Sequence, residues 1–205
     1  MDAGHSIRDD GLSRAYKTKL RIAQALNELC QATPFARLPI DMIAAQAGVS
    51  RSSFYHHFAD KNAVVLWLTE QFYANGIDQT GRTLTWFEGH LNTTRGMQRY
   101  KTLFLSAAEN NEFSAGMPFF ARHRVATLKE TITQWKHLEL TDRLNFQIEA
   151  LPHAEMVMSN KYESGELNVT LKQFCDLMVS LVPHDLYEAL KDPVRRETLR
   201  GDFFL

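Results

Sequence analysis

Apolar residues recur at helical spacing along nearly the whole chain, and this periodicity constrains the fold more than any other feature. No stretch alternates apolar and polar residues as a half-buried strand does, and no Asn-Gly or Asp-Gly turn joins two such stretches. No internal repeat indicates a solenoid. The sequence therefore predicts an all-α protein.

The opening part of the chain predicts one long helix followed by a short one. Ser13 can cap a helix that runs to about Ala32, after which Thr33-Pro34 stops it. A second helix covers residues 40–47, with apolar residues at i, i+3, i+4 and i+7, and it ends at Gly48. The small alanines on its inner face allow close approach of another helix.

A third helix of similar length should follow after a tight turn. Ser50 can cap a helix over residues 51–57, in which Phe54 and Phe58 point into the core at i and i+4. Four polar or aromatic residues then face outward: Ser52, Ser53, Tyr55 and His56. The two short helices have the proportions of a helix-turn-helix.

The rest of the chain predicts further helices. Asp60 can cap a fourth helix that ends at Asn75-Gly76. We expect a break or kink before Pro152, because proline lacks the backbone donor that a helix interior needs. The other expected helices cover 78–91, 96–110, 118–137, 141–163, 170–182 and 184–191. We expect a helix-turn-helix domain over 13–60 and a helical domain over 61–205.

The outward residues of the third helix suit contact with DNA. In a helix-turn-helix the second helix enters the major groove, where Arg51 can pair with guanine through two hydrogen bonds. Ser52 and Ser53 can bond to several bases, and Tyr55 and His56 can reach phosphate oxygens. Three lysines could contact the DNA backbone: Lys17, Lys19 and Lys61. Helix-turn-helix units also occur in proteins that never bind DNA, so the motif alone is a hypothesis.

Charge is distributed unevenly along the chain. The formal net charge is −1, which gives no global sign of a nucleic-acid partner. Residues 13–61 nevertheless carry a net +4, and the remainder of the chain carries −5. This local excess favours an anionic partner for the first domain.

Residues 43–58, IAAQAGVSRSSFYHHF, together with Lys61, resemble the TetR family of bacterial transcription regulators. The resemblance covers about 17–68. It implies a three-helix domain that binds operator DNA, a fourth helix that links it to a variable helical domain, and pairing of two subunits through their last long helices. It places Arg51, Ser52 and Ser53 where members read bases. Pro39 and Ile40 depart from the Thr or Ser that often opens the second helix, so the resemblance carries no phosphate contact there.

The helical C-terminal part is rich in large apolar residues that could line an effector cavity. Our candidates for this site are Trp86, Phe104, Phe120, His123 and Phe146. A stripe of leucines with Phe174 and Met178 over 167–181, with part of the helix that holds Leu144 and Ile148, could instead form a dimer bundle. Core, cavity and interface compete for these residues, and the sequence does not divide them.

Signatures of catalysis, metal binding and secretion were sought as well. No H-E-x-x-H, G-x-S-x-G or phosphate-binding glycine motif occurs, so we expect no enzyme and no cofactor. His56 and His57 are adjacent and point in different directions, so we expect no metal there, and the two distant cysteines indicate no disulfide. Residues 1–10 hold three aspartates and no apolar run, so we expect a cytoplasmic protein without a membrane segment.

Together these features favour a homodimeric repressor that binds a pseudo-palindromic operator and responds to a small apolar or amphipathic effector. Two alternatives stay open: a DNA-binding regulator controlled by a protein partner, with a filled core and no cavity, and an all-α enzyme. The effector, the operator and the regulated genes cannot be read from the sequence.

Overall fold

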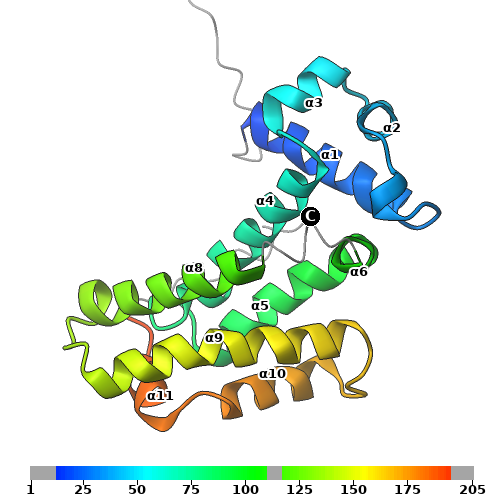
Figure 1. The fold of residues 1–205 in the computed structure, drawn as a ribbon. Coiled ribbons are helices and arrows are strands. Elements are labelled where there is room, and N and C mark those ends of the chain that lie inside the picture. Colours follow the sequence, from blue (N-terminus) through cyan, green and yellow to red (C-terminus); the bar gives the residue numbers. More distant parts are fainter. Residues whose placement is uncertain (1–12, 110–116, 195–205) are drawn as a thin grey trace, which may run out of the picture. The chain divides into compact units, whose positions relative to one another are not determined.

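The computed structural model describes residues 13–109 and 117–194, and every regular element in these ranges is helical (Figure 1). The prediction of an all-α fold is confirmed. The α-helices are α1 (Arg14–Leu29), α2 (Ile40–Gln46), α3 (Arg51–His57), α4 (Lys61–Ala74), α5 (Trp86–Arg99), α6 (Lys101–Ala108), α8 (Met117–Glu130), α9 (Asp142–Glu163), α10 (Leu171–Ser180) and α11 (His184–Leu190). Short 3-10 turns cover Phe35–Arg37 and Ile77–Gln79, and a π-helical turn, Thr131–Trp135, follows α8.

The described chain divides into two compact units. The first, called here the N-unit, contains residues 13–68 and 102–109, and the second, the C-unit, contains 69–101 and 117–194. Helix α4 is continuous from one unit into the other. The expected boundary between 60 and 61 takes no account of 102–109, which belong to the N-unit because their contacts lie there.

Two hydrogen bonds attach α6 to the N-unit. The backbone N–H of Phe35 donates to the Ser106 hydroxyl at 2.9 Å, and the backbone N–H of Leu103 donates to the Asn27 side-chain oxygen at 3.1 Å. Residues more than 70 positions apart are therefore joined by side chains that satisfy backbone donors at a loop and at a helix start.

Side-chain caps define the first helices as expected. The Ser13 hydroxyl accepts from the backbone N–H of Tyr16, and the Ser50 hydroxyl accepts from that of Ser53. The Asp60 carboxylate accepts from the backbone N–H of Ala63 at the start of α4. Gly48 has a φ of 64°, a left-handed conformation that glycine adopts without steric cost, so α2 ends there and the chain turns into α3.

Two expectations for the C-unit were wrong, the start of the helix expected over 78–91 and a break before Pro152, whereas a kink at Pro152 stays a prediction. The helix expected over 78–91 begins instead at Trp86, because Thr85 and Glu88 form a capping box in which each side chain accepts from the other residue's backbone N–H. Helix α9 runs unbroken through Pro152. The hydrogen bond that proline removes costs about 3 kcal/mol. Pro152 and its neighbour Leu151 are buried in the fold, and this packing opposes a break.

The C-unit core lies between α5, α8, α9 and α11. Helix α8 packs along α9, and α10 packs along α5 (Figure 1). The largest fully buried side chain of this core is Trp86, and around it lie Leu128, Ile132, Ile148, Leu151, Val182, Leu186 and Leu190. Within the described ranges, no helix is both long enough and apolar enough to cross a membrane.

Candidate nucleic-acid interface

Aromatic side chains fix the position of α3 from beneath. Phe54 is fully buried and Phe58 nearly so, with their ring centres 6.1 Å apart, and Phe58 lies 5.8 Å from Trp67 of α4. Trp67 in turn meets Tyr16 of α1 edge to face at 5.4 Å. Because α3 is only two turns long, these anchors and not its own hydrogen bonds decide its orientation.

The outer face of α3 presents the residues that the sequence analysis selected. Arg51, Ser52 and His56 are exposed, and Tyr55 has 46% of its surface exposed. Ser53 is half-buried. None of these five side chains is occluded inside the unit, so the helix can approach another molecule with hydroxyl, guanidinium and imidazole groups.

Arg51 is held by a carboxylate from the preceding helix. Its Nη1 donates to both oxygens of Asp41 at 2.8 Å, and its guanidinium lies 5.6 Å from the Tyr55 ring centre. The hydrogen bond and the charge of Asp41 raise the pKa of Arg51. The pair is exposed and stabilises the fold little. Because Nη1 makes both bonds to Asp41, the other donors of the guanidinium take no part in this pair and can reach a base edge.

Lys61 has a structural task within the N-unit. Its ammonium group donates to three backbone carbonyls, those of Phe35 at 2.7 Å, Ala36 at 3.0 Å and Leu38 at 3.1 Å. The group also lies 5.0 Å from the Phe35 ring centre. An ammonium has three donors, so these bonds use them all. Contact between Lys61 and phosphate stays a prediction, and it would require one of these bonds to be given up.

Lys17 and Lys19 lie on α1 and are half-buried. The ammonium of Lys19 lies 5.4 Å from the Phe58 ring centre and 5.6 Å from that of Trp67, which is a cation–π arrangement over the aromatic anchors of α3. Their contacts with the DNA backbone remain predictions.

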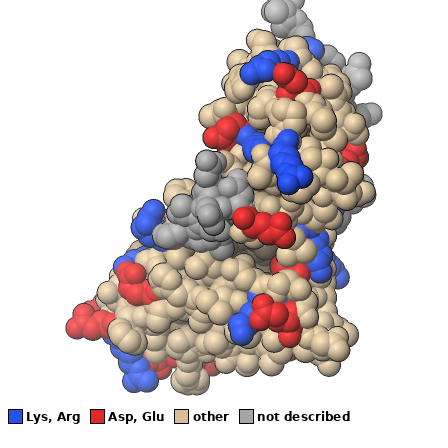
Figure 2. Space-filling model, turned by 45° about the vertical axis from the view of Figure 1, so that its right-hand side comes forward, with Lys and Arg blue, Asp and Glu red and all other residues tan. Residues whose placement is uncertain are grey.

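Basic and acidic side chains are interspersed over the face drawn in Figure 2, with no uniformly basic surface. On this face, an anion would be attracted by particular groups and not by a basic surface. Two arginines of α1, Arg14 and Arg21, line one pocket of the N-unit with Ser53, His56 and His57 of α3. These two arginines and His57 were not among the residues predicted from the sequence. The positions of Arg14 and Arg21, four residues before and three residues after Thr18, could have indicated that they share one face of α1.

The five candidates for an effector site do not belong to one unit. Trp86 is a core residue with 1% exposure, and Phe104 of α6 belongs to the N-unit. Phe146 has 75% of its surface exposed on α9, so it lines no cavity within the chain. Phe120 and His123 of α8 remain, and both lie near the Tyr73 ring, at 5.7 Å and 6.3 Å between ring centres.

His123 has an acidic partner in this cluster. Its Nε2 lies 2.7 Å from a carboxylate oxygen of Asp78, and this hydrogen bond raises the pKa of His123 above its ordinary value. Burial raises the pKa of the neighbouring Tyr73 hydroxyl. An imidazole that is half-buried, paired with a carboxylate and next to the Tyr73 ring can orient a ligand that is partly apolar and partly polar.

A second polar group is buried deeper in the C-unit, and the sequence analysis missed it. Arg124 and Glu155 are 2% and 6% exposed, and the Arg124 Nε donates to the Glu155 carboxylate at 3.3 Å. Arg124 Nη1 also donates to the backbone carbonyl of Ile77, and His90 Nε2 lies 3.6 Å from the other Glu155 oxygen. Burial lowers the pKa of His90 to about 4, so this imidazole is neutral at pH 7.

Among the described residues, no three His, Cys, Asp or Glu side chains are arranged to hold a metal ion. Cys30 and Cys175 are both buried, and burial raises the pKa of each thiol to about 11. At neutral pH both are therefore unreactive thiols.

Comparison with known proteins gives one family match and several similar folds. Residues 22–67, which span half of α1, all of α2 and α3 and half of α4, match the sequence model described as "Bacterial regulatory proteins, tetR family". No curated protein matches the sequence significantly.

Three solved structures illustrate the likeness in fold. A protein titled "Dihydroxyacetone kinase operon activator DhaS" superposes with a TM-score of 0.63 at 16% identity, covering 85% of this chain and 98% of its own. A TetR transcriptional regulator from Rhodococcus sp. RHA1 gives 0.53 at 16% identity, covering 80% and 93%. A tetR-family transcriptional regulator from Streptomyces coelicolor gives 0.53 at 13% identity, covering 83% and 88%. At these identities the likeness shows the fold alone.

Proposed function

We propose that this TetR-family DNA-binding transcriptional regulator represses transcription as a homodimer on a pseudo-palindromic operator, and that it releases the operator when a small effector binds the C-unit. Its N-terminal domain carries the match to the family. Regulators of this family act by binding DNA and are not enzymes. The observation that carries the proposal is the exposed face of α3, with Arg51, Ser52 and Tyr55 outward over the buried rings of Phe54 and Phe58.

Base reading is assigned to Arg51 with the two serines beside it. A guanidinium donates two parallel hydrogen bonds to the O6 and N7 of guanine, and a hydroxyl both donates and accepts. Tyr55 and His56, one turn further along α3, are placed to contact the adjacent backbone. In a two-fold symmetric dimer the two copies of α3 would lie about 34 to 36 Å apart, which matches one turn of DNA.

The dimer interface is assigned to α9 and α10. Phe146 and Val157 are exposed on α9, at 75% and 51%, and Leu177 and Leu181 are exposed on α10, at 52% and 36%. Phe146 and Val157 are eleven positions apart, which is three helical turns and places them on one side of α9. Both helices pack against each other in the C-unit, so their exposed apolar residues can form one face of a four-helix bundle with a second copy.

The effector site is assigned to the cluster of Tyr73, Asp78, Phe120 and His123. Tyr73 lies in the last turn of α4, and this helix begins with Lys61 in the N-unit. An effector that binds more tightly to the conformation with α4 in one position than to the conformation with α4 in another would change the distance between the two α3 helices of the dimer. A difference in affinity corresponding to about 1 to 3 kcal/mol is typical of such coupling.

Selection of bound sequences from a random pool of duplex DNA tests the proposal. A two-fold symmetric consensus supports both base reading and dimerisation. Arg51→Ala should then lower discrimination at one guanine of each half-site by about 1 to 3 kcal/mol and leave binding to random duplex nearly unchanged. Recovery of no consensus, or an Arg51→Ala variant that keeps the wild-type preference at every position, overturns the assignment.

A further inference from the structure

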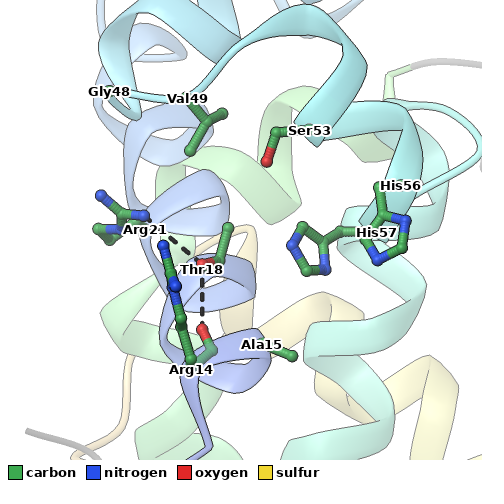
Figure 3. Close-up of a pocket in the computed structure, with 9 residues that line it drawn as sticks. All are labelled: Arg14, Ala15, Thr18, Arg21, Gly48, Val49, Ser53, His56 and His57. Carbon is green, nitrogen blue, oxygen red and sulfur yellow. Dashed lines mark hydrogen bonds between the residues drawn. The ribbon is translucent and has the colours of Figure 1, made fainter. Parts of the chain in front are cut away.

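A groove of about 510 Å³ opens in the N-unit between the first turns of α1 and helix α3 (Figure 3). Arg14, Thr18 and Arg21 line it from α1, at i, i+4 and i+7 on one face of that helix. Ser53, His56 and His57 line it from α3. The groove is therefore bounded on two sides by side chains that donate hydrogen bonds.

The arginines of the groove have no acidic partner among the residues that the structure describes. Arg21 Nη2 donates only weakly to the Thr18 hydroxyl, at 3.5 Å, and Thr18 donates to the backbone carbonyl of Arg14 at 3.0 Å. Among the described residues that line the groove there is no Asp or Glu. Figure 3 shows Arg14 and Arg21 on the same side of the groove, with the His57 ring across from them. Two guanidinium groups kept together without a carboxylate favour an anion between them.

His57 lies across the groove from the two arginines. Partial burial and the charges of His56 and Lys19 lower the pKa of His57. The His56 and His57 rings meet edge to face, with their centres 5.1 Å apart. A bound anion would reverse this effect and favour the protonated imidazole, which donates from both ring nitrogens.

We infer that this groove binds one phosphate group of the DNA backbone, next to the bases that α3 reads. The inference rests on the proposed function and adds Arg14, Arg21 and His57 to its contacts. DNA is the source of the phosphate because Ser53 and His56 line the groove from the same helix that presents Arg51 and Tyr55. Helix α1 packs against α2 and α3, so Arg14 and Arg21 lie beside the helix that would enter the major groove.

The contact fixes the depth and angle of α3 and carries no sequence information. Arginine suits this task better than lysine, since its planar fork matches two phosphate oxygens. The two arginines come from the first and second turns of a 16-residue helix that is packed against α2 and α3, so their position follows that of the reading helix.

The test combines arginine variants with single neutral phosphates in the selected operator. Arg14→Met and Arg21→Met should each lower affinity about tenfold, equally for operator and random duplex, and reduce the slope of log Kd against log salt by about one. Arg95→Met, an exposed arginine of α5 in the C-unit, is the matched control and should change neither quantity. Circular dichroism and the melting temperature show whether each variant folds. If Arg21→Met does not fold, Arg21→Lys replaces it, since lysine keeps the charge but lacks the planar fork.

Single methylphosphonate substitutions locate the contact. At one phosphate in each half-site, the methylphosphonate should lower the affinity of wild type. It should not lower the already reduced affinity of Arg21→Met any further, so that the effects of the DNA substitution and the protein substitution are not additive. Equal losses for wild type and variant at every phosphate overturn the inference. If that occurs while inorganic phosphate raises the melting temperature of wild type and not of Arg21→Met, the groove binds a free phosphorylated molecule instead.

The outcome also separates this inference from the proposed function. If Arg51→Ala loses discrimination between bases while the effects of Arg21→Met and of each methylphosphonate add, the assignment of base reading to Arg51 stands. Only the assignment of a phosphate to the groove is then overturned. A wild-type protein that binds no duplex specifically would overturn the proposed function itself.

Discussion

The two units of this protein use charged residues in opposite ways. In the N-unit the buried core is aliphatic and aromatic, Thr18 is the only polar residue among its described buried positions, and Arg14 and Arg21 face a groove without carboxylates. In the C-unit Arg124, Glu155, His90 and Asp78 are all buried inside the fold. In our proposal the groove arginines of the N-unit meet an external anion, whereas the buried charges of the C-unit are compensated internally.

Breaking the buried pair of the C-unit should have the largest effect. Glu155→Gln leaves the Arg124 guanidinium buried without a counter-charge, which should lower the free energy of unfolding by about 3 to 5 kcal/mol in urea denaturation. The double variant Arg124→Met with Glu155→Met should recover much of this loss, because no uncompensated charge remains. The control Lys172→Met breaks the exposed pair with Asp176 and should cost under about 1 kcal/mol. Equal costs for the buried and exposed pairs would remove the contrast between the units.

Acid should destabilise the C-unit through His90. In the unfolded chain this imidazole takes up a proton near its ordinary pKa of 6.5, whereas in the folded chain it stays neutral until about 4. Unfolding therefore binds a proton in that window, and stability falls as the pH drops from 6.5 to 4, by at most about 3 kcal/mol.

A second histidine gives the opposite slope. The pKa of His123 is raised by Asp78, so its contribution is fully present below pH 6.5 and is lost as the pH rises through its folded value. Melting curves from pH 4 to 8 should show a flatter acid slope for His90→Gln and a steeper net rise of stability with pH for His123→Gln. An acid slope that is the same in wild type and His90→Gln would contradict the burial of a neutral imidazole.

Removal of the Lys61 ammonium should destabilise the N-unit by a smaller amount, about 2 kcal/mol, since three carbonyls lose a charged donor and can be solvated in its absence. Lys61→Met is compared with wild type by urea unfolding of the protein without DNA. A variant that keeps wild-type stability and loses only DNA affinity would show that Lys61 acts on phosphate, as the sequence resemblance implies, and would sharpen the contrast by adding an external cation to the N-unit.

Local signals predicted the N-unit well. Ser13, Ser50 and Asp60 act as caps because each side chain needs only the backbone three residues ahead, and Gly48 ends α2 through its own conformational freedom. The start of α5 was missed although Thr85-x-x-Glu88 is a local signal of the same kind. The start of this helix was predicted from the spacing of apolar residues, although the capping residues locate it better.

The roles of individual site residues were harder to predict. Asp41 lies in the first turn of α2 and holds Arg51 ten positions later, a pairing that no local sequence signal predicts. Phe146 was expected to line a cavity, and it faces outward, whereas Phe174 and Met178 of the expected dimer stripe are core residues beside exposed Leu177. Amphipathic spacing shows that residues share a helix face, but several helix faces in a bundle are apolar, and only packing decides which one meets another subunit.

The sequence by itself determined the helices of the N-unit, their caps and the polar face of α3, because these depend on interactions within a few residues. The tertiary structure alone decided that residues 102–109 join the N-unit, that Lys61 bonds to three carbonyls more than twenty positions away, and that Arg124 meets Glu155 inside the C-unit. The physical reason is that a charged group's energy depends on its distance from partners and from water, and these distances are set only when remote segments pack together.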